Sequence, residues 1–173
     1  MANWHMLTLV GADRPGIVAR LTDALFRAHC SLGEASMLRL GENFTIMMMV
    51  SGGDGADALL SVVEPVAREL GLRFHIDPIE GGLHRHQVPN FQVRVHGADR
   101  AGIVAQVTGA LVGVGFNILE LESDVAGNAA QPVYIMNIQG YCEAALEELE
   151  QALQNLASQG IDVDVCPVET LIG

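Results

Sequence analysis

The feature that most constrains the fold of this chain is an internal repeat. Residues 11–19 read GADRPGIVA and residues 97–105 read GADRAGIVA, so eight of nine positions are identical at an offset of 86 residues. That offset is half of the 173-residue chain. Because a solenoid needs three or more repeats to bury its core, two copies indicate a duplicated domain of about 85 residues instead.

Each copy predicts the same order of secondary structure. Residues 91–96 alternate strictly between apolar and polar side chains, which predicts a half-buried strand with Phe91, Val93 and Val95 facing the core. The shared loop follows, and then apolar residues recur at helical spacing. These helical residues are Ile17, Val18, Leu21 and Leu25 in the first copy and Ile103, Val104, Val107 and Leu111 in the second.

A hairpin, a second helix and a closing strand complete each copy. The first hairpin has a tight turn at residues 41–43, and the second has a looser connection at residues 126–132. Pro65 lies inside the second helix of the first copy and should kink or split it. The expected segments are 36–50, 56–70 and 73–78 in the first copy and 118–139, 146–156 and 161–168 in the second.

This order, βαββαβ twice, predicts an α+β protein made of two ferredoxin-like domains. Each domain should be a four-stranded antiparallel sheet with two helices on one face. Glycines and a proline interrupt the pattern between the copies. We therefore expect a first domain at 1–80, a linker at 81–89 and a second domain at 90–173.

The strands at residues 46–50 and 133–136 are apolar on both sides, whereas a sheet with one wet face normally alternates. We therefore expect the helix-free faces or edges to be covered by the sister domain or by another subunit, which predicts a homo-oligomer. We expect Met47–Met49 to belong to the core and Tyr134 to lie on a covered face.

The charge of the chain restricts its partners. The nine basic residues are all arginine and face 21 acidic residues, for a formal net charge of −12. Such a surface repels phosphate backbones, so we expect no direct nucleic-acid binding, and the strands also lack the exposed aromatic residues that RNA-binding sheets use. Residues 87–173 hold 11 of the acids and only two arginines, so a basic partner should meet the second half.

The cysteines are Cys30, Cys142 and Cys166, an odd number at wide spacing. They predict free thiols in a reducing compartment, the cytoplasm, with Cys30 and Cys166 buried. No apolar run approaches the ~20 residues of a membrane span, and we expect no signal peptide. His84 and His86 have no nearby cysteine to complete a metal site, so we predict no metal.

The shared loop, between a strand and a helix, is the candidate ligand site. A helix N-terminus presents unpaired N–H groups that donate hydrogen bonds to small anions, and the glycines of the loop let a ligand approach the backbone. The arginines could bind a carboxylate and the aspartates an ammonium group, which together would hold a free amino acid. Turn formation and helix capping would use the same residue types, so a structural role stays open. The loop candidates are Asp13, Arg14, Gly16 and Ile17 in the first copy and Asp99, Arg100, Gly102 and Ile103 in the second.

The loop sequence GADRPGIV, together with LGENFTIMMMVSG at residues 40–52, resembles the glycine cleavage system transcriptional repressor family. Proteins of that family have two ACT domains in tandem, and the resemblance covers essentially the whole chain. It implies small βαββαβ regulatory modules that bind amino acids near the loop after the first strand. It also implies a repressor without a DNA-binding element of its own, which holds a separate DNA-binding activator until glycine releases it.

The resemblance adds one further candidate residue. Many ACT domains use an asparagine at the start of the second strand to contact the ligand, which implies a ligand contact for Asn117. The first copy has Ser31 at this position.

Two other functions compete with amino-acid sensing by a transcriptional repressor. A regulatory ACT protein could control a metabolic enzyme instead. The chain could itself be an enzyme, but it has no room for a catalytic domain beyond the repeats, and no cluster of nucleophile, base and orienting group can be identified. We therefore predict no enzyme activity and no cofactor. The few bonds that glycine can make predict micromolar to millimolar affinity, as expected for a sensor.

Overall fold

The computed structural model describes residues 3–52, 55–79, 87–98, 101–128 and 131–168. Two compact units, Met1–Leu83 and His84–Gly173, make up the chain, and each is considered by itself. Several predicted features lie outside the described residues. They are linker residues 81–86 with His84 and His86, and the loop residues Asp99 and Arg100.

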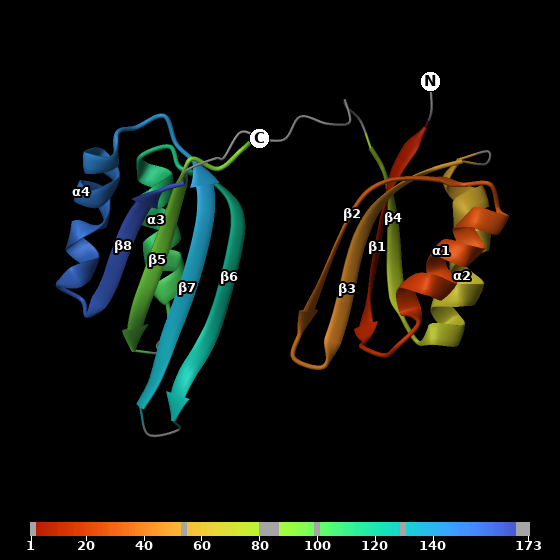
Figure 1. The fold of residues 1–173 in the computed structure, drawn as a ribbon, viewed down its shortest axis with the longest axis horizontal. Helices are drawn as coiled ribbons and strands as arrows, with labels where there is room; N and C mark the ends of the chain where they lie inside the picture. The colour runs from red at the N-terminus through yellow and green to blue at the C-terminus, as the bar shows by residue number, and fades with distance from the viewer. Residues whose placement is uncertain (1–2, 53–54, 80–86, 99–100, 129–130, 169–173) are drawn as a thin grey trace. The chain divides into compact units, whose positions relative to one another are not determined.

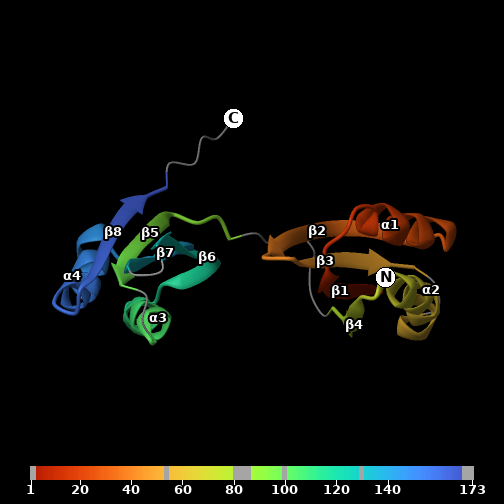
Figure 2. The ribbon, with the colours of Figure 1, turned by 90° about the horizontal axis from the view of Figure 1, so that it is seen from below.

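Each unit is the predicted sandwich of a four-stranded antiparallel sheet with two helices on one face (Figures 1 and 2), which confirms the α+β ferredoxin-like fold. The strand orders are β2-β3-β1-β4 and β6-β7-β5-β8. The elements of unit 1 are β1 (Trp4–Ala12), α1 (Ile17–Arg27), β2 (Ser31–Leu40), β3 (Asn43–Ser51), α2 (Ala56–Leu70) and β4 (Arg73–Pro78). Those of unit 2 are β5 (Phe91–Ala98), α3 (Ile103–Gly113), β6 (Asn117–Asn128), β7 (Gln131–Tyr141), α4 (Leu146–Ala157) and β8 (Ile161–Pro167).

The first helix of each unit packs through a narrow stripe. In α1 this stripe is Ile17, Leu21 and Leu25, spaced by four residues and fully or almost fully buried. Val18 was predicted to share the stripe but is 36% exposed, because a step of one residue turns a side chain by about 100° away from the core. Its counterpart Val104 in α3 is exposed in the same way.

The hairpin of unit 2 is tighter than predicted. Its pairing continues past the expected loop to Asn128 opposite Gln131, with Gly127 opposite Pro132. Pro132 directly precedes Val133, which is the first residue of β7 in the described pairing with β5, opposite Ala98. In unit 1 the turn is the expected tight one, with Leu40 opposite Asn43.

Helix α2 runs without interruption through Pro65, so of the predicted kink or split the split is wrong and the kink stays a prediction. A stripe of buried residues holds the helix on the sheet on both sides of the proline. Pro65 itself is exposed, as is Ser61, whose carbonyl loses its intrahelical donor. Water can satisfy that carbonyl, so the helix continues. The buried stripe is Leu59, Val63, Ala67 and Leu70.

The two helix-free sheet faces differ in polarity. In unit 1, Met47 lies opposite Thr8 on this face and is 49% exposed, so of the three methionines expected in the core only Met48 is buried. In unit 2 the ladder positions on the free face include Arg94 opposite Asn137. Tyr134 lies on the other side of that sheet, against the core. The free face of unit 1 thus pairs Met6 with Met49 and Thr8 with Met47, and its covering by the sister domain or by another subunit stays a prediction.

The buried cysteine is Cys142, whose thiol donates a hydrogen bond to the carbonyl of Val114 at 3.3 Å. Cys30 and Cys166 are only partly buried, so the prediction that both are core thiols is wrong. Cys166 lies on the edge strand β8, where its side chain shares the free face with Gln92.

Candidate functional site

The two repeated loops start their helices in the same way. Gly16 and Gly102 hold the N-cap positions with φ of 90°, and no side chain among the described residues caps either helix. Regular pairing begins with the amide of Arg20, which donates to the carbonyl of Gly16 at 3.0 Å. The prediction that Asp13 could cap α1 is therefore wrong. Uncapped first-turn amides are the groups at a helix N-terminus that donate hydrogen bonds to a small anion.

Ile17 and Ile103 are the first helical residues, and their side chains are 2% and 3% exposed. They anchor the helix starts in the cores. Each of them can therefore meet a ligand only through its backbone amide, and the loop offers main-chain donors together with the charges that surround it.

Asp13 is held by a residue that the sequence analysis missed. Arg39 of β2 donates from Nε to Oδ2 of Asp13 at 2.6 Å, and the Asp13 amide donates to the carbonyl of Glu42 at 2.8 Å. Both contacts join the loop to the β2–β3 hairpin. No local motif marks Arg39, because only the register of that hairpin brings it to the loop.

Arg14 extends toward the end of α2. Its Nη2 donates to the carbonyl of Glu69 at 3.2 Å, which places a cation at the negative end of that helix. The carboxylate of Glu69 also pairs with Arg20 of α1. Since Arg14 is exposed and makes one long bond, a ligand carboxylate could compete for it at small cost.

The surroundings of the second loop differ at the position of Arg39. The repeat aligns Gly11 with Gly97, and these residues lie opposite Phe44 and Tyr134 in their sheets. Across the neighbouring strand on the other side, Phe44 pairs with Arg39 of β2, whereas Tyr134 pairs with Val125 of β6. An ion pair like that of Asp13 is therefore not available from this position in unit 2.

Asn117 does not lie beside the repeated loop of its own unit. It begins β6 opposite Tyr141, and the next residue of β7 is Gly140, which pairs with Phe91 at the start of β5. Gly102 follows the far end of β5, so the two positions are about 25 Å apart. The amide of Asn117 donates to Oε1 of Gln87 at 2.7 Å.

Other chemistry is sparse in the described ranges. Within them, no three His, Cys, Asp or Glu side chains come together as a metal site, and no helix has the length and apolarity to cross a membrane. What the loops offer is recognition of a small anion by backbone amides, with arginine and carboxylate groups nearby.

Comparison with known families agrees with this fold and loop. The ACT domain family matches residues 5–77 and again residues 90–165, and the chain therefore belongs to the ACT domain family as a tandem protein. A curated relative is the glycine cleavage system transcriptional repressor of Escherichia coli (strain K12), 27% identical over 91% of this chain and 85% of the relative. The predicted resemblance to that repressor family is thus confirmed.

Two crystal structures share the complete two-unit fold. One is a protein of unknown function from Galdieria sulphuraria, with a TM-score of 0.80 and 24% identity over 98% of this chain and all of that chain. The other is a candidate glycine cleavage system transcriptional repressor, with a TM-score of 0.72 and 18% identity over 98% of this chain and 99% of that chain. At these identities the likeness shows the fold alone.

Proposed function

We propose that this chain is a non-enzymatic regulatory protein that senses glycine or a similarly small amino acid and represses transcription by contact with a DNA-binding activator. A regulatory role is supported by its two ACT domains and by the name of the Escherichia coli relative. The observation that carries the sensing proposal is the pair of helix starts, neither capped by a described side chain and both with glycine at a φ of 90°.

We place the sensing loop in unit 2. The carboxylate of the amino acid would accept hydrogen bonds from the first-turn amides of α3, with Gly102 leaving room for it, and Asp99 and Arg100 would supply the complementary charges. In unit 1 Asp13 is already bound by Arg39, so its ammonium-binding capacity is reduced. Asn117 is left out of this site because it lies at the other end of β5.

A proline scan of the helix starts tests this assignment. Val104 is exposed, so Val104→Pro removes one first-turn amide of α3 and leaves the buried stripe intact. Val18→Pro is the matched change in unit 1. By calorimetry, we expect Val104→Pro to abolish glycine binding and Val18→Pro to leave the affinity within about threefold. Equal effects would refute a unit 2 site, and no heat with any of the twenty amino acids at about 10 mM would refute sensing.

The partner part of the proposal has a separate test. The net charge of −12 disfavours direct contact with DNA. In a gel-shift assay at low salt, the chain alone should leave DNA unshifted, and it should alter the shift produced by a DNA-binding activator. A shift by the chain alone would contradict action through a partner.

A further inference from the structure

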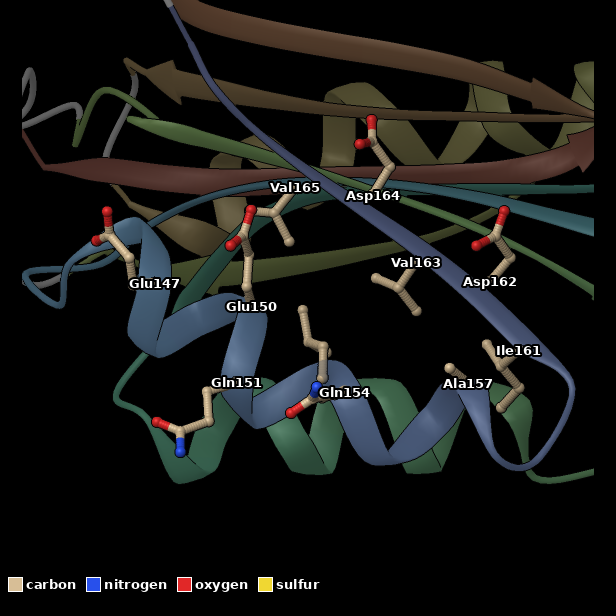
Figure 3. A pocket seen from close by; sticks show the side chains of 11 residues that line it. Glu147, Glu150, Gln151, Gln154, Ala157, Ile161, Asp162, Val163, Asp164 and Val165 are labelled. Carbon is tan, nitrogen blue, oxygen red and sulfur yellow. The ribbon is translucent and has the colours of Figure 1, made fainter.

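A groove of about 490 Å³ runs between α4 and the edge strand β8 of unit 2 (Figure 3). Val163 and Val165 point from β8 toward the helix and form an apolar floor. Two carboxylates of α4, those of Glu147 and Glu150, stand beside that floor. Asp162 and Asp164 of β8 alternate with the valines and point to the helix-free side of the same strand.

One side of the groove is an unpaired strand edge. In the sheet order β6-β7-β5-β8, β5 is the one described strand that pairs with β8. The other edge of β8 presents backbone N–H and C=O groups that an extended peptide could pair with as a fifth strand. Every second side chain of such a peptide would then lie on the apolar floor, and the side chains between them would lie on the face of Asp162 and Asp164.

The negative charge of the groove is not neutralised by the described residues. None of the four carboxylates forms an ion pair with a described arginine or histidine, and Asp164 accepts only a hydrogen bond from the thiol of Cys166 at 3.2 Å. Arg94, across the ladder from Asp164, donates to Gln92. An incoming cation would therefore meet carboxylates to which no described cationic side chain is bound.

This acidity is specific to unit 2. The repeat aligns Thr8 of β1 with Arg94 of β5, and these residues lie opposite His75 and Asp164. By the same register Arg73 takes the place of Asp162. The edge strand β4 of unit 1 thus carries arginine and histidine at the positions where β8 carries aspartates.

We infer that the α4–β8 groove binds an extended, basic segment of a partner protein, which adds to β8 as a strand and alternates arginine or lysine with small apolar residues. The inference rests on the proposed function only in requiring a protein partner. A second copy docked β8 to β8 would bring Asp162 and Asp164 against the same residues, and this repulsion disfavours it. A strand with cations at alternate positions meets opposite charge instead.

The test measures fluorescence anisotropy of a labelled eight-residue peptide that alternates arginine and valine, with the intact chain. A second peptide has the same sequence with alternate backbone amides methylated, which blocks strand pairing and keeps the charge. The groove variant is E147Q/E150Q/D162N/D164N. The control variant, E120Q/E122Q/D124N/E143Q, removes the same charge from exposed positions of unit 2 outside the groove.

We expect the unmethylated peptide to bind, the groove variant to weaken it by about tenfold or more, the control variant to change it by less than about threefold, and methylation to abolish it. The inference is overturned if no peptide binds, if both variants lose affinity equally, or if the methylated peptide binds as well. It is also overturned if the groove variant changes the sedimentation coefficient of the chain, since a second copy would then be the occupant. Each of these results leaves amino-acid sensing and contact with an activator elsewhere intact.

Discussion

Arg39 Nε lies 2.6 Å from Asp13 Oδ2, so a charge on the β2–β3 hairpin fixes the loop that precedes α1. The corresponding position in unit 2 is Val125. Two loops with nearly the same sequence therefore have different neighbours. The loop of unit 1 is held by this ion pair, whereas the loop of unit 2 is the one proposed to sense an amino acid.

The strength of this ion pair is measurable by a double-mutant cycle. Asp13→Asn combined with Arg39→Gln should give a coupling of about 0.5–1 kcal/mol in urea unfolding, because the Arg39 side chain is 64% exposed and water screens the pair. The Asp23–Arg27 pair within α1 is the control and should couple by about 0.3–0.5 kcal/mol. A coupling that does not fall in 1 M salt would argue against an ionic contact.

The left-handed backbone conformation of the α3 N-cap predicts opposite effects of alanine substitution at two glycines of unit 2. Gly102 has a φ of 90°, so Gly102→Ala should destabilise the unit by about 1–2 kcal/mol through backbone strain. Gly109 lies inside α3, and a methyl group there meets nothing within 4 Å. Gly109→Ala should therefore stabilise by about 0.5–1 kcal/mol. Thermal unfolding of both variants decides the matter, and a stabilising Gly102→Ala would contradict the described N-cap.

Cys166 should be a slow nucleophile. Its hydrogen bond to the Asp164 carboxylate, then burial, and then the charge of that carboxylate raise the pKa of the thiol above its usual value, against a smaller opposing effect of Arg94. A raised pKa leaves less thiolate at a given pH, so iodoacetamide should alkylate Cys166 more slowly between pH 8 and 9 than a cysteine in a short peptide. Asp164→Asn should shift the alkylation profile to lower pH.

Site-resolved mass spectrometry follows each thiol separately in that experiment. Cys30, whose pKa is raised by burial alone, is the internal control and should not respond to Asp164→Asn. If Cys166 reacts at the peptide rate in the parent chain, the hydrogen bond from its thiol to Asp164 is not formed in solution.

Pro65 offers a simple gain in stability. The residue lies inside α2 and is exposed, so Pro65→Ala restores the amide that the carbonyl of Ser61 lacks without disturbing the core. We expect a gain of about 1–3 kcal/mol in chemical unfolding. Glu64→Ala, at the neighbouring exposed position, should change stability by less than about 0.5 kcal/mol. An unchanged or lower stability for Pro65→Ala would mean that the proline imposes no strain on the helix.

Most of the fold followed from the sequence because repetition and periodicity are local signals. The alternation expected at residues 91–96 is present in β5, and the segment expected at residues 146–156 corresponds to α4. The errors arose where tertiary context overrides a local preference. Helix α2 continues through Pro65, since buried residues on both sides of the proline hold the helix on the sheet. Gly127 and Pro132 extend the β6–β7 pairing, although both residue types usually mark a loop.

The candidate site was only partly accessible to sequence reasoning. The duplicated motif led directly to Gly16 and Gly102, because positive φ and glycine go together. Arg39 could not be found, since its contact with Asp13 depends on hairpin register. The position of Asn117 at the far end of β5 likewise follows from strand direction, which a motif match does not reveal.

We propose that the start of α3 binds a small amino acid through its backbone amides. The most direct test is a ¹H–¹⁵N correlation spectrum of the labelled chain titrated with glycine. We expect saturable shifts centred on the amides of Gly102, Ile103 and Val104, with weaker or no shifts at the start of α1. Shifts that cluster on another element, or a spectrum unchanged at about 10 mM glycine, would contradict this proposal.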